Sequence, residues 1–215
     1  MANVEAEEKN YDRKYKKEFI FVEPIMKIGY LLLSADPIHI GHISMASKCI
    51  NDGVLDEVIL CPCVQNPWKD APIASFEQRC EMISNICKFI NHCELEDIEK
   101  DLFPPYYSCN TLKALYNKYG KDENEHYIIG GVDVVDSLSS WMNYESMIKG
   151  RFGVIAFTRG GKKPETEEVP YVLVESDIPD LSSTYIRRLI SDGLNPYPYI
   201  PKCNLKLCKE IYSDS

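Results

Sequence analysis

Two histidines stand three residues apart directly after an apolar stretch, in the segment DPIHIGH that runs from Asp36 to His42. Pro37 ends the stretch, and Gly41 lets another group come close to the backbone. A helix that begins here offers free amides and a partial positive charge, which favour phosphate. The imidazoles of His39 and His42 can donate hydrogen bonds to phosphate oxygens beside it. The chain holds only 4 histidines, so a pair of them in this turn predicts a phosphate site.

A second segment that could bind phosphate is LSSTYIR, from Leu181 to Arg187. Hydroxyl groups at a helix start, here those of Ser183 and Thr184, can cap the helix and bind phosphate. Arg187 can grip two phosphate oxygens at once through its planar guanidinium. By itself such a sequence is an ordinary helix start. Together with the histidine pair, it predicts a clamp that holds a phosphate chain from two sides.

The elements that must position these residues alternate between strand and helix. Apolar runs predict strands at 25–34, 57–63, 93–98, 127–130, 153–158 and 171–175. Helical patterns cover 41–51, 75–92, 108 or 110 to 119, 137–148, 183–191 and 200–212. Strands separated by helices form right-handed β-α-β units, so we expect a Rossmann-like α/β fold: a doubly wound, mostly parallel sheet with helices on both faces. Ligands bind such sheets at the carboxyl ends of the strands, where the informative residues fall.

The helix at 75–92 has the clearest start signal. Ser75 and Gln78 are spaced as a capping box, in which each side chain can bond to the other residue's backbone amide. The residues expected on its inner face are Cys80, Ile83, Cys87 and Ile90.

Composition limits the function classes that remain. The 215 residues suffice for one sizeable core, and we expect a charged N-terminal extension at 1–20 and a single domain at 21–215. A net charge of -9 argues against nucleic-acid and anionic-membrane partners, which favour basic surfaces. No apolar run approaches the roughly 18 residues of a membrane span, and the N-terminal residues contain no signal-peptide core. We therefore expect a cytoplasmic protein, with the nucleus as the alternative.

The cysteines do not indicate a metal site. There are 9 of them, an odd number, and they are scattered along the chain. They form no C-x-x-C motif, and no histidine stands at the spacing that zinc needs. We expect reduced, partly buried cysteines, as in an intracellular protein.

Taken together, the motifs resemble those of the nicotinate/nicotinamide mononucleotide adenylyltransferases, above all the bacterial-type nicotinate-nucleotide enzymes, in the superfamily that H-x-G-H marks. The resemblance runs from about Ile28 to Ile211. Further matches are the loop from Pro62 to Lys69 with Trp68 where a His is usual, the helix residues Ser75, Arg79 and Met82, the segment Tyr106 to Leu112, the strand end Ile129 to Asp133, Trp141, and the turn Arg159-Gly160. Two departures are Leu32-Leu33-Ser34-Ala35, where the family has G-G-T/S-F, and Asn110, where it has Asp.

The resemblance implies that AMP moves from ATP to nicotinate mononucleotide, and also to nicotinamide mononucleotide, with the dinucleotide (deamido-NAD or NAD) and pyrophosphate as products, in NAD biosynthesis. It implies direct in-line transfer without a nucleophilic side chain. Mg²⁺ would come with ATP and take its ligands from phosphate oxygens and water, with none from protein side chains. No tightly bound organic cofactor is expected.

The resemblance also assigns roles to individual residues. The catalytic residues would be His39, His42, Lys69 and Arg187. ATP and its adenosine would be bound by Ser34, Ala35, Gly41, Gly130, Gly131, Asp133, Ser183 and Thr184. The mononucleotide would be bound by Trp141, Thr111, Tyr107, Trp68 and Arg159. Without the resemblance, Trp141 would be interpreted as a core residue, and Arg79 fits a structural ion pair as well as a phosphate ligand.

Several other proteins share part of this pattern. Phosphopantetheine adenylyltransferase is usually shorter and lacks the G-x-D followed by Trp, and cytidylyltransferases usually carry R-T-x-G-I-S-T where this chain has Leu181 to Thr184. Class I aminoacyl-tRNA synthetases need a K-M-S-K-S-type loop and a tRNA-binding domain, which are absent. A non-catalytic nucleotide sensor would not need His39, His42, Lys69 and Arg187. The sequence leaves open the preference between the two mononucleotides and association into a homo-oligomer.

Overall fold

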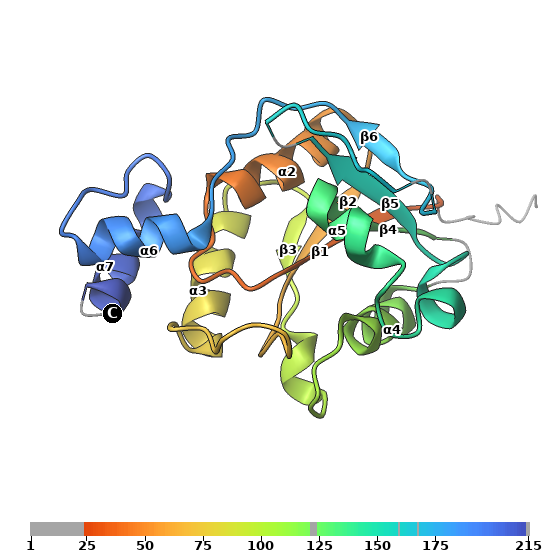
Figure 1. Cartoon of the computed structure of the whole chain (residues 1–215), viewed down its shortest axis with the longest axis horizontal. Coiled ribbons are helices and arrows are strands. Elements are labelled where there is room, and N and C mark those ends of the chain that lie inside the picture. Colours follow the sequence, from red (N-terminus) through yellow and green to blue (C-terminus); the bar gives the residue numbers. More distant parts are fainter. Residues whose placement is uncertain (1–23, 121–123, 159, 167, 214–215) are drawn as a thin grey trace, which may run out of the picture.

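The computed structural model describes residues 24–120, 124–158, 160–166 and 168–213, apart from the side chain of Met147, and the statements below concern this part of the chain (Figure 1). The predicted N-terminal extension at 1–20 lies outside it. The strands are β1 (Lys27–Leu33), β2 (Glu57–Pro62), β3 (Cys93–Leu95), β4 (Glu125–Gly131), β5 (Gly153–Phe157) and β6 (Val172–Val174). They form a 6-stranded sheet in the order β3-β2-β1-β4-β5-β6, and every neighbouring pair is parallel.

Helices cover both faces of this sheet. The α-helices are α2 (Ile40–Asn51), α3 (Phe76–Cys87), α4 (Ser108–Tyr119), α5 (Val132–Leu138), α6 (Ser183–Ser191) and α7 (Leu205–Tyr212). Leu31 and Leu33 of β1 pack with α2, α3 and the C-terminal helices, while Ile28 and Tyr30 pack with α4 and α5. Figure 1 shows α6 and α7 at one end of the molecule, beside α3. The predicted doubly wound α/β fold is therefore confirmed. None of the helices in the described part is long and apolar enough to cross a membrane.

The strand order creates a switch point at the middle of the sheet. The chain runs outward from β1 through β2 to β3, and then returns to the other side of β1 with β4 before it continues to β5 and β6. The carboxyl ends of β1 and β4 are therefore neighbours, with helices leaving them toward opposite faces. A crevice at this place is the usual ligand site of a doubly wound sheet.

The predicted helix at 137–148 is wrong. Here α5 begins at Val132, and a separate π-helical turn follows at Tyr144–Ile148. Gly130 explains the early start, because a Cβ there would lie 2.6 Å from the Cβ of Val134 and would block the direct turn from β4 into α5. Asn143, with φ of 59°, turns the chain again before the second element. Trp141 therefore lies in a turn and not on a helix.

The predicted helix at 75–92 is correct at its start but wrong in its inner face and its end. The capping box of Ser75 and Gln78 is present, and the helix ends at Cys87. Its buried residues are Arg79, Met82, Ile83 and Ile86. The inner face is rotated from the predicted one because Arg79, a charged residue, points inward. The predicted strand at 93–98 is likewise shorter, since a 3-10 turn (Ile98–Asp101) follows β3, and the predicted helix at 200–212 divides into a 3-10 turn (Lys202–Asn204) and α7.

A fall in pH should lower the free energy of unfolding, because the imidazole of His126 is buried between the sheet and the helices. His126 of β4 is 4% exposed, packs against Tyr116 and Phe152, and hydrogen-bonds to the hydroxyl of Tyr30. Its Nε2 has no hydrogen-bond partner among the described residues, and burial lowers its pKa. The unfolded chain then binds the proton more readily, so the stability that neutral His126 contributes is complete above a pH of about 6.5 and is lost below it.

Urea unfolding at a pH of about 7.5 and again at about 5.5 measures this contribution as a fall in the free energy of unfolding. In His126→Phe, which keeps an aromatic ring at the site, the fall should be smaller. The exposed His92 supplies the matched control, since His92→Asn should keep the full pH dependence. An equal fall in wild type and His126→Phe would assign the effect to other groups.

Candidate functional site

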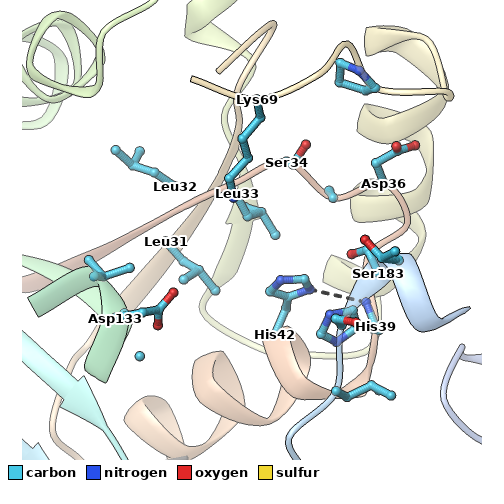
Figure 2. Close-up of a pocket in the computed structure, with 18 of the residues that line it drawn as sticks. Leu31, Leu32, Leu33, Ser34, Asp36, His39, His42, Lys69, Asp133 and Ser183 are labelled. Carbon is cyan, nitrogen blue, oxygen red and sulfur yellow. Dashed lines mark hydrogen bonds between the residues drawn. The ribbon is translucent and has the colours of Figure 1, made fainter. Parts of the chain in front are cut away.

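A cavity of about 1170 Å³ opens at the carboxyl ends of β1 and β4. Its lining includes most of the predicted phosphate and adenosine ligands: Ser34, Ala35, His39, His42, Lys69, Gly130, Gly131, Asp133, Ser183, Thr184 and Arg187. Figure 2 shows His39, His42 and Ser183 close together, with Asp133 across the space from them. Segments at the two ends of the chain therefore meet at one cavity, as the two motifs predict.

The two histidines are fixed by the first turn of α2. His39 is the N-cap, and its Nδ1 accepts a hydrogen bond of 3.2 Å from the backbone N–H of Gly41. The Nδ1 of His42 in turn accepts from the backbone N–H of His39 at 3.4 Å, and the two rings stack with their centroids 3.9 Å apart. Because both Nδ1 atoms accept, each neutral ring carries its proton on Nε2. Each Nε2–H is then a hydrogen-bond donor suited to a phosphate oxygen.

Gly41 serves this arrangement without lining the cavity. A Cβ at this position would lie 3.0 Å from both Nδ1 and Cε1 of His39. The missing side chain lets the His39 ring fold back over the turn and receive the amide. The predicted direct contact of Gly41 with ATP is not favoured, because Gly41 is buried and its N–H already bonds to His39.

The second phosphate segment is held against the first. Ser182 caps α6 by accepting from the N–H of Tyr185, and the hydroxyl of Ser183 donates to the backbone oxygen of Pro37 at 2.9 Å. The guanidinium of Arg187 donates to the backbone oxygen of Asp36 at 2.6 Å and to the hydroxyl of Thr184 at 3.2 Å. The start of α6 is thus joined directly to the turn that carries the histidines.

Among the described residues, Arg79 bonds to backbone oxygens, and it lines neither the cavity above nor the loop's exposed face. Its side chain is 1% exposed, and its three guanidinium nitrogens donate to the backbone oxygens of Ser34, Cys63, Val64 and Ala74. These oxygens belong to the end of β1, the end of β2 and the start of α3. Arg79 therefore joins the chain segments on both sides of the loop that carries Lys69.

Lys69 lies on this exposed loop between β2 and α3. Figure 2 shows its side chain reaching from the loop toward the end of β1 near Leu33. The side-chain amide of Gln65 donates to the backbone oxygen of Lys69 at 2.8 Å and so folds the loop on itself. Arg79 fixes both ends of the loop, while the middle of the loop is exposed. Such a loop is a suitable support for a cation that contacts phosphates.

A second cavity of about 720 Å³ adjoins the first. Tyr107, Trp68 and Trp141 line it, as predicted for the mononucleotide, and Leu32, Ser34, Lys69 and Asp133 line both cavities. Trp68 is 83% exposed, whereas Trp141 is half-buried and its indole N–H donates to the hydroxyl of Ser137. The two cavities therefore share part of their lining near the switch point of the sheet.

Thr111 does not line this cavity. It is 0% exposed, and its hydroxyl donates to Glu99 at 2.5 Å. Glu99, which does line the cavity, also accepts from the N–H of Val64 at 2.6 Å. Burial raises the pKa of Glu99, while the hydrogen bonds from Thr111 and Val64 act in the opposite direction. The predicted direct contact of Thr111 with the mononucleotide is replaced by support of a carboxylate behind the wall.

Two of the residues that sequence reasoning left without a role are carboxylates. Asp36 is the first residue of the segment DPIHIGH, and Glu99 stands in the 3-10 turn after β3. Both are buried and hydrogen-bonded at the edge of a cavity. The only feature of the sequence that could have indicated a role for Asp36 is its place between an apolar strand and a proline. Arg159 lies outside the described residues.

The cysteines near the site have the properties of buried thiols. All 9 are free, and only Cys203 is exposed, in agreement with the expected reduced and partly buried state. Cys63 and Cys109 line the second cavity. Burial raises the pKa of Cys63, and of Cys61 beside it, which keeps both thiols protonated.

The chain resembles known proteins along most of its length. The family model described as cytidylyltransferase-like matches residues 34–189. A "Probable nicotinate-nucleotide adenylyltransferase" from Flavobacterium johnsoniae is 30% identical over 181 residues, which are 82% of this chain and 92% of the relative. A protein of the same name from Lactiplantibacillus plantarum is 30% identical over 198 residues, 92% of each chain.

Solved structures share the fold. The Plasmodium falciparum nicotinic acid mononucleotide adenylyltransferase complexed with NaAD matches with a TM-score of 0.69 at 19% identity, and the match covers 88% of this chain and 98% of that one. The Plasmodium falciparum nicotinic acid mononucleotide adenylyltransferase complexed with APC matches with a TM-score of 0.66 at 19% identity, over 88% of this chain and 98% of that one.

Proposed function

The chain belongs to the cytidylyltransferase-like family and, within it, to the nicotinate-nucleotide adenylyltransferases, and from this membership we propose that it transfers AMP from ATP to nicotinate mononucleotide, and also to nicotinamide mononucleotide. The products are the dinucleotide, deamido-NAD or NAD, and pyrophosphate, which places the reaction in NAD biosynthesis. The observation that carries this proposal is the pair of adjoining cavities, one lined by His39, His42 and Arg187 and the other by Trp141. Two cavities that meet suit two nucleotide halves that must be joined.

The reaction is a direct transfer between two anions. An oxygen of the mononucleotide 5′-phosphate attacks the α-phosphorus of ATP in line, the bond from that phosphorus to the β-phosphate oxygen breaks, and pyrophosphate leaves with the bonding electrons. A phosphate monoester has a second pKa of about 6, so the attacking oxygen is already ionised near neutrality and no base is required. The protein contributes positioning and neutralisation of charge. The protonated thiols near the site agree with a route that uses no protein nucleophile.

Each side of the phosphate chain has its own donors. The Nε2–H groups of His39 and His42 donate to ATP phosphate oxygens and to the charge that develops in transfer. Lys69 contacts the phosphates from its loop, and Arg187 holds the β,γ end with Ser183 and Thr184. These side chains lie on different elements, so the geometry of transfer depends on the packing of α2 against α6.

Mg²⁺ would neutralise phosphate charge and polarise the phosphoryl oxygens. It commonly binds through substrate phosphates and retained waters, which suits a site where imidazoles and cations face the phosphates. The described residues contain no group of three or more His, Cys, Asp or Glu side chains that could hold a metal ion. The protein's own part is to hold the phosphates through Lys69, Arg187 and the histidine pair.

The nucleoside ends of the two substrates have their own binding residues. Asp133, exposed in the first turn of α5, accepts from the adenosine ribose hydroxyls beside the backbone of Gly130 and Gly131. The indole of Trp141 stacks on the pyridine ring, with Tyr107 beside it and Trp68 over the opening. Leu32 stands where the two cavities meet, at the place of a family glycine. We place the reaction in the cytoplasm, which the free cysteines support.

Pyrophosphate release tests the function directly. The chain is incubated with ATP, Mg²⁺ and, in separate reactions, nicotinate mononucleotide, nicotinamide mononucleotide, phosphopantetheine or no acceptor. We expect release with both pyridine mononucleotides and a larger kcat/KM for nicotinate mononucleotide. Release with phosphopantetheine alone would move the chain to another branch of the superfamily, and no release with any acceptor would overturn the enzymatic proposal.

The acceptor side of the site has its own prediction. Trp141→Ala should raise the KM for the mononucleotide by about tenfold to a hundredfold, because stacking of a base on an aromatic side chain contributes about 1–3 kcal/mol. The KM for ATP should stay nearly constant, and steady-state kinetics with each substrate varied in turn measures both. Phe89→Ala, at an exposed aromatic residue that lines neither cavity, is the control. Equal KM values in Trp141→Ala and wild type would remove Trp141 from the site.

A further inference from the structure

One carboxylate connects the ATP side of the site to the last helix of the described chain. Asp36 is 5% exposed, and its Oδ1 accepts from the hydroxyl of Tyr212 at 2.7 Å and from the N–H of Ala74 at 3.0 Å. Its Oδ2 accepts from the N–H of Ile73 at 3.0 Å and lies 3.4 Å from the guanidinium of Arg187. Four chain segments therefore meet at a single side chain.

Arg187 depends on this junction for its position. The same terminal nitrogen that approaches the Asp36 carboxylate also donates to the Asp36 backbone oxygen, while the other terminal nitrogen donates to Thr184. A guanidinium carries five N–H donors, more than these contacts use, and Arg187 lines the larger cavity. Asp36 thus fixes one edge of the guanidinium, which leaves donors for a phosphate.

Tyr212 is built into the protein as a donor to Asp36. It is the last residue of α7 and is 0% exposed. Burial, with the neighbouring carboxylate, raises its pKa, so the phenol stays protonated and keeps its donor. The helix is anchored from its other end, where Asn204 donates to the backbone oxygen of Met82 at 2.8 Å. The hydroxyl of Tyr212 is therefore held in place by the packing of α7 against α3.

We infer that Tyr212 is a positioning residue for the triphosphate of ATP, which it acts on through Asp36 by fixing Arg187 and the Ile73-Ala74 end of the loop that carries Lys69. The inference rests on the proposed function in taking ATP as the nucleotide. Tyr212 lines neither cavity, so it touches no substrate. Its influence should fall mainly on ATP, because Arg187 lines only the larger cavity, and much less on the mononucleotide on the other side of Leu32.

Tyr212→Phe removes the hydroxyl and keeps the ring in its buried place. The Asp36 carboxylate then loses one charge-assisted hydrogen bond and is held by its remaining donors alone, so its orientation and the edge it presents to Arg187 change. A hydrogen bond to a charged group contributes enough that we expect the affinity for ATP to fall by about tenfold. The KM for the mononucleotide should change much less than the KM for ATP.

Binding and kinetic measurements together distinguish a positioning role of Tyr212 from an effect on protein stability alone. Calorimetric titration with a non-hydrolysable ATP analogue gives Kd for wild type, Tyr212→Phe and the control Tyr199→Phe, which removes a hydroxyl from the same C-terminal region without touching Asp36. A loss of folded protein lowers the number of binding sites and kcat but leaves Kd and both KM values unchanged. A positioning role raises Kd and the KM for ATP, and raises the KM for the mononucleotide much less.

A double-mutant cycle with Arg187→Ala decides the route of the effect. If Tyr212 acts through Arg187, Tyr212→Phe should weaken binding of the analogue in the wild-type background and much less in the Arg187→Ala background. Equal Kd values for wild type and Tyr212→Phe, or additive effects in the cycle, would overturn the inference. If Tyr212→Phe does not fold, Asp36→Asn replaces it in the cycle. This variant keeps the shape of the Asp36 side chain and removes its charge, so it should also raise Kd for the analogue. Failure of the proposed function would appear separately, as wild-type protein that binds the analogue but releases no pyrophosphate.

Discussion

His42→Ala should lower kcat for pyrophosphate release by about a hundredfold to a thousandfold, because it removes a donor aimed at charge that develops on the transferred phosphate. The ring of His42 stacks on that of His39, and its Nδ1 accepts from the His39 backbone, so the Nε2–H has a fixed direction. A donor fixed in this way needs no reorganisation during the reaction. The KM for either substrate should change much less than kcat, since the contact strengthens in the transition state.

A comparison of variants at His39 separates its proposed catalytic role from its role in capping α2. His39 caps α2 as well as lining the cavity, so His39→Ala removes both roles. His39→Asn keeps an N-cap acceptor but places no donor where Nε2 was. We expect His39→Asn to retain the thermal stability of wild type and to lose kcat, and His92→Asn, at a residue that lines neither cavity, to retain both. Wild-type kcat in His42→Ala and His39→Asn would exclude the proposed role of the pair.

Arg79→Met should lower the free energy of unfolding by about 3–5 kcal/mol, the largest effect on stability that we expect in this chain. Methionine fills much of the same volume but leaves the backbone oxygens of Ser34, Cys63, Val64 and Ala74 without the donors that Arg79 supplies. Buried acceptors that lose their partner pay the cost of desolvation without compensation. The loop that carries Lys69 also loses the connection between its two ends.

Urea unfolding of Arg79→Met, Arg79→Lys and the exposed-site control Lys113→Met measures this effect. The lysine variant keeps the charge but has one nitrogen in place of three, so it should fall between wild type and Arg79→Met. Lys113→Met should stay within about 0.5 kcal/mol of wild type, as surface changes usually do. A loss below about 1 kcal/mol in Arg79→Met would mean that water replaces the guanidinium at these oxygens.

The sequence predicted the architecture because its signals were local. Apolar runs at the length of strands, separated by helical patterns, are enough to indicate a parallel sheet with helices on both faces. The two phosphate motifs lie at opposite ends of the chain, yet their shared placement at strand ends predicted that they would meet. Ser183, Thr184 and Arg187 do line the cavity of the histidine pair.

What the sequence could not predict depends on contacts between distant segments. The sequence around Thr111 is the same whether its side chain faces a cavity or a buried carboxylate, and only the position of Glu99 decides between them. Arg79 was ambiguous because a charged residue on a helix gives no periodic signal for burial. Asp36 acquired its role from Arg187 and Tyr212, which are 151 and 176 residues away along the chain.

The order of the strands affects when the parts of the site come together as the chain is synthesised. β1, the histidine turn, β2 and β3 can assemble as soon as they emerge, because each new strand adds to the outer side of the last. β4 must then pair with the other edge of β1, and Arg187 and Tyr212 are synthesised 151 and 176 residues after Asp36. A nascent chain therefore carries the histidine pair long before it has the opposite half of the clamp.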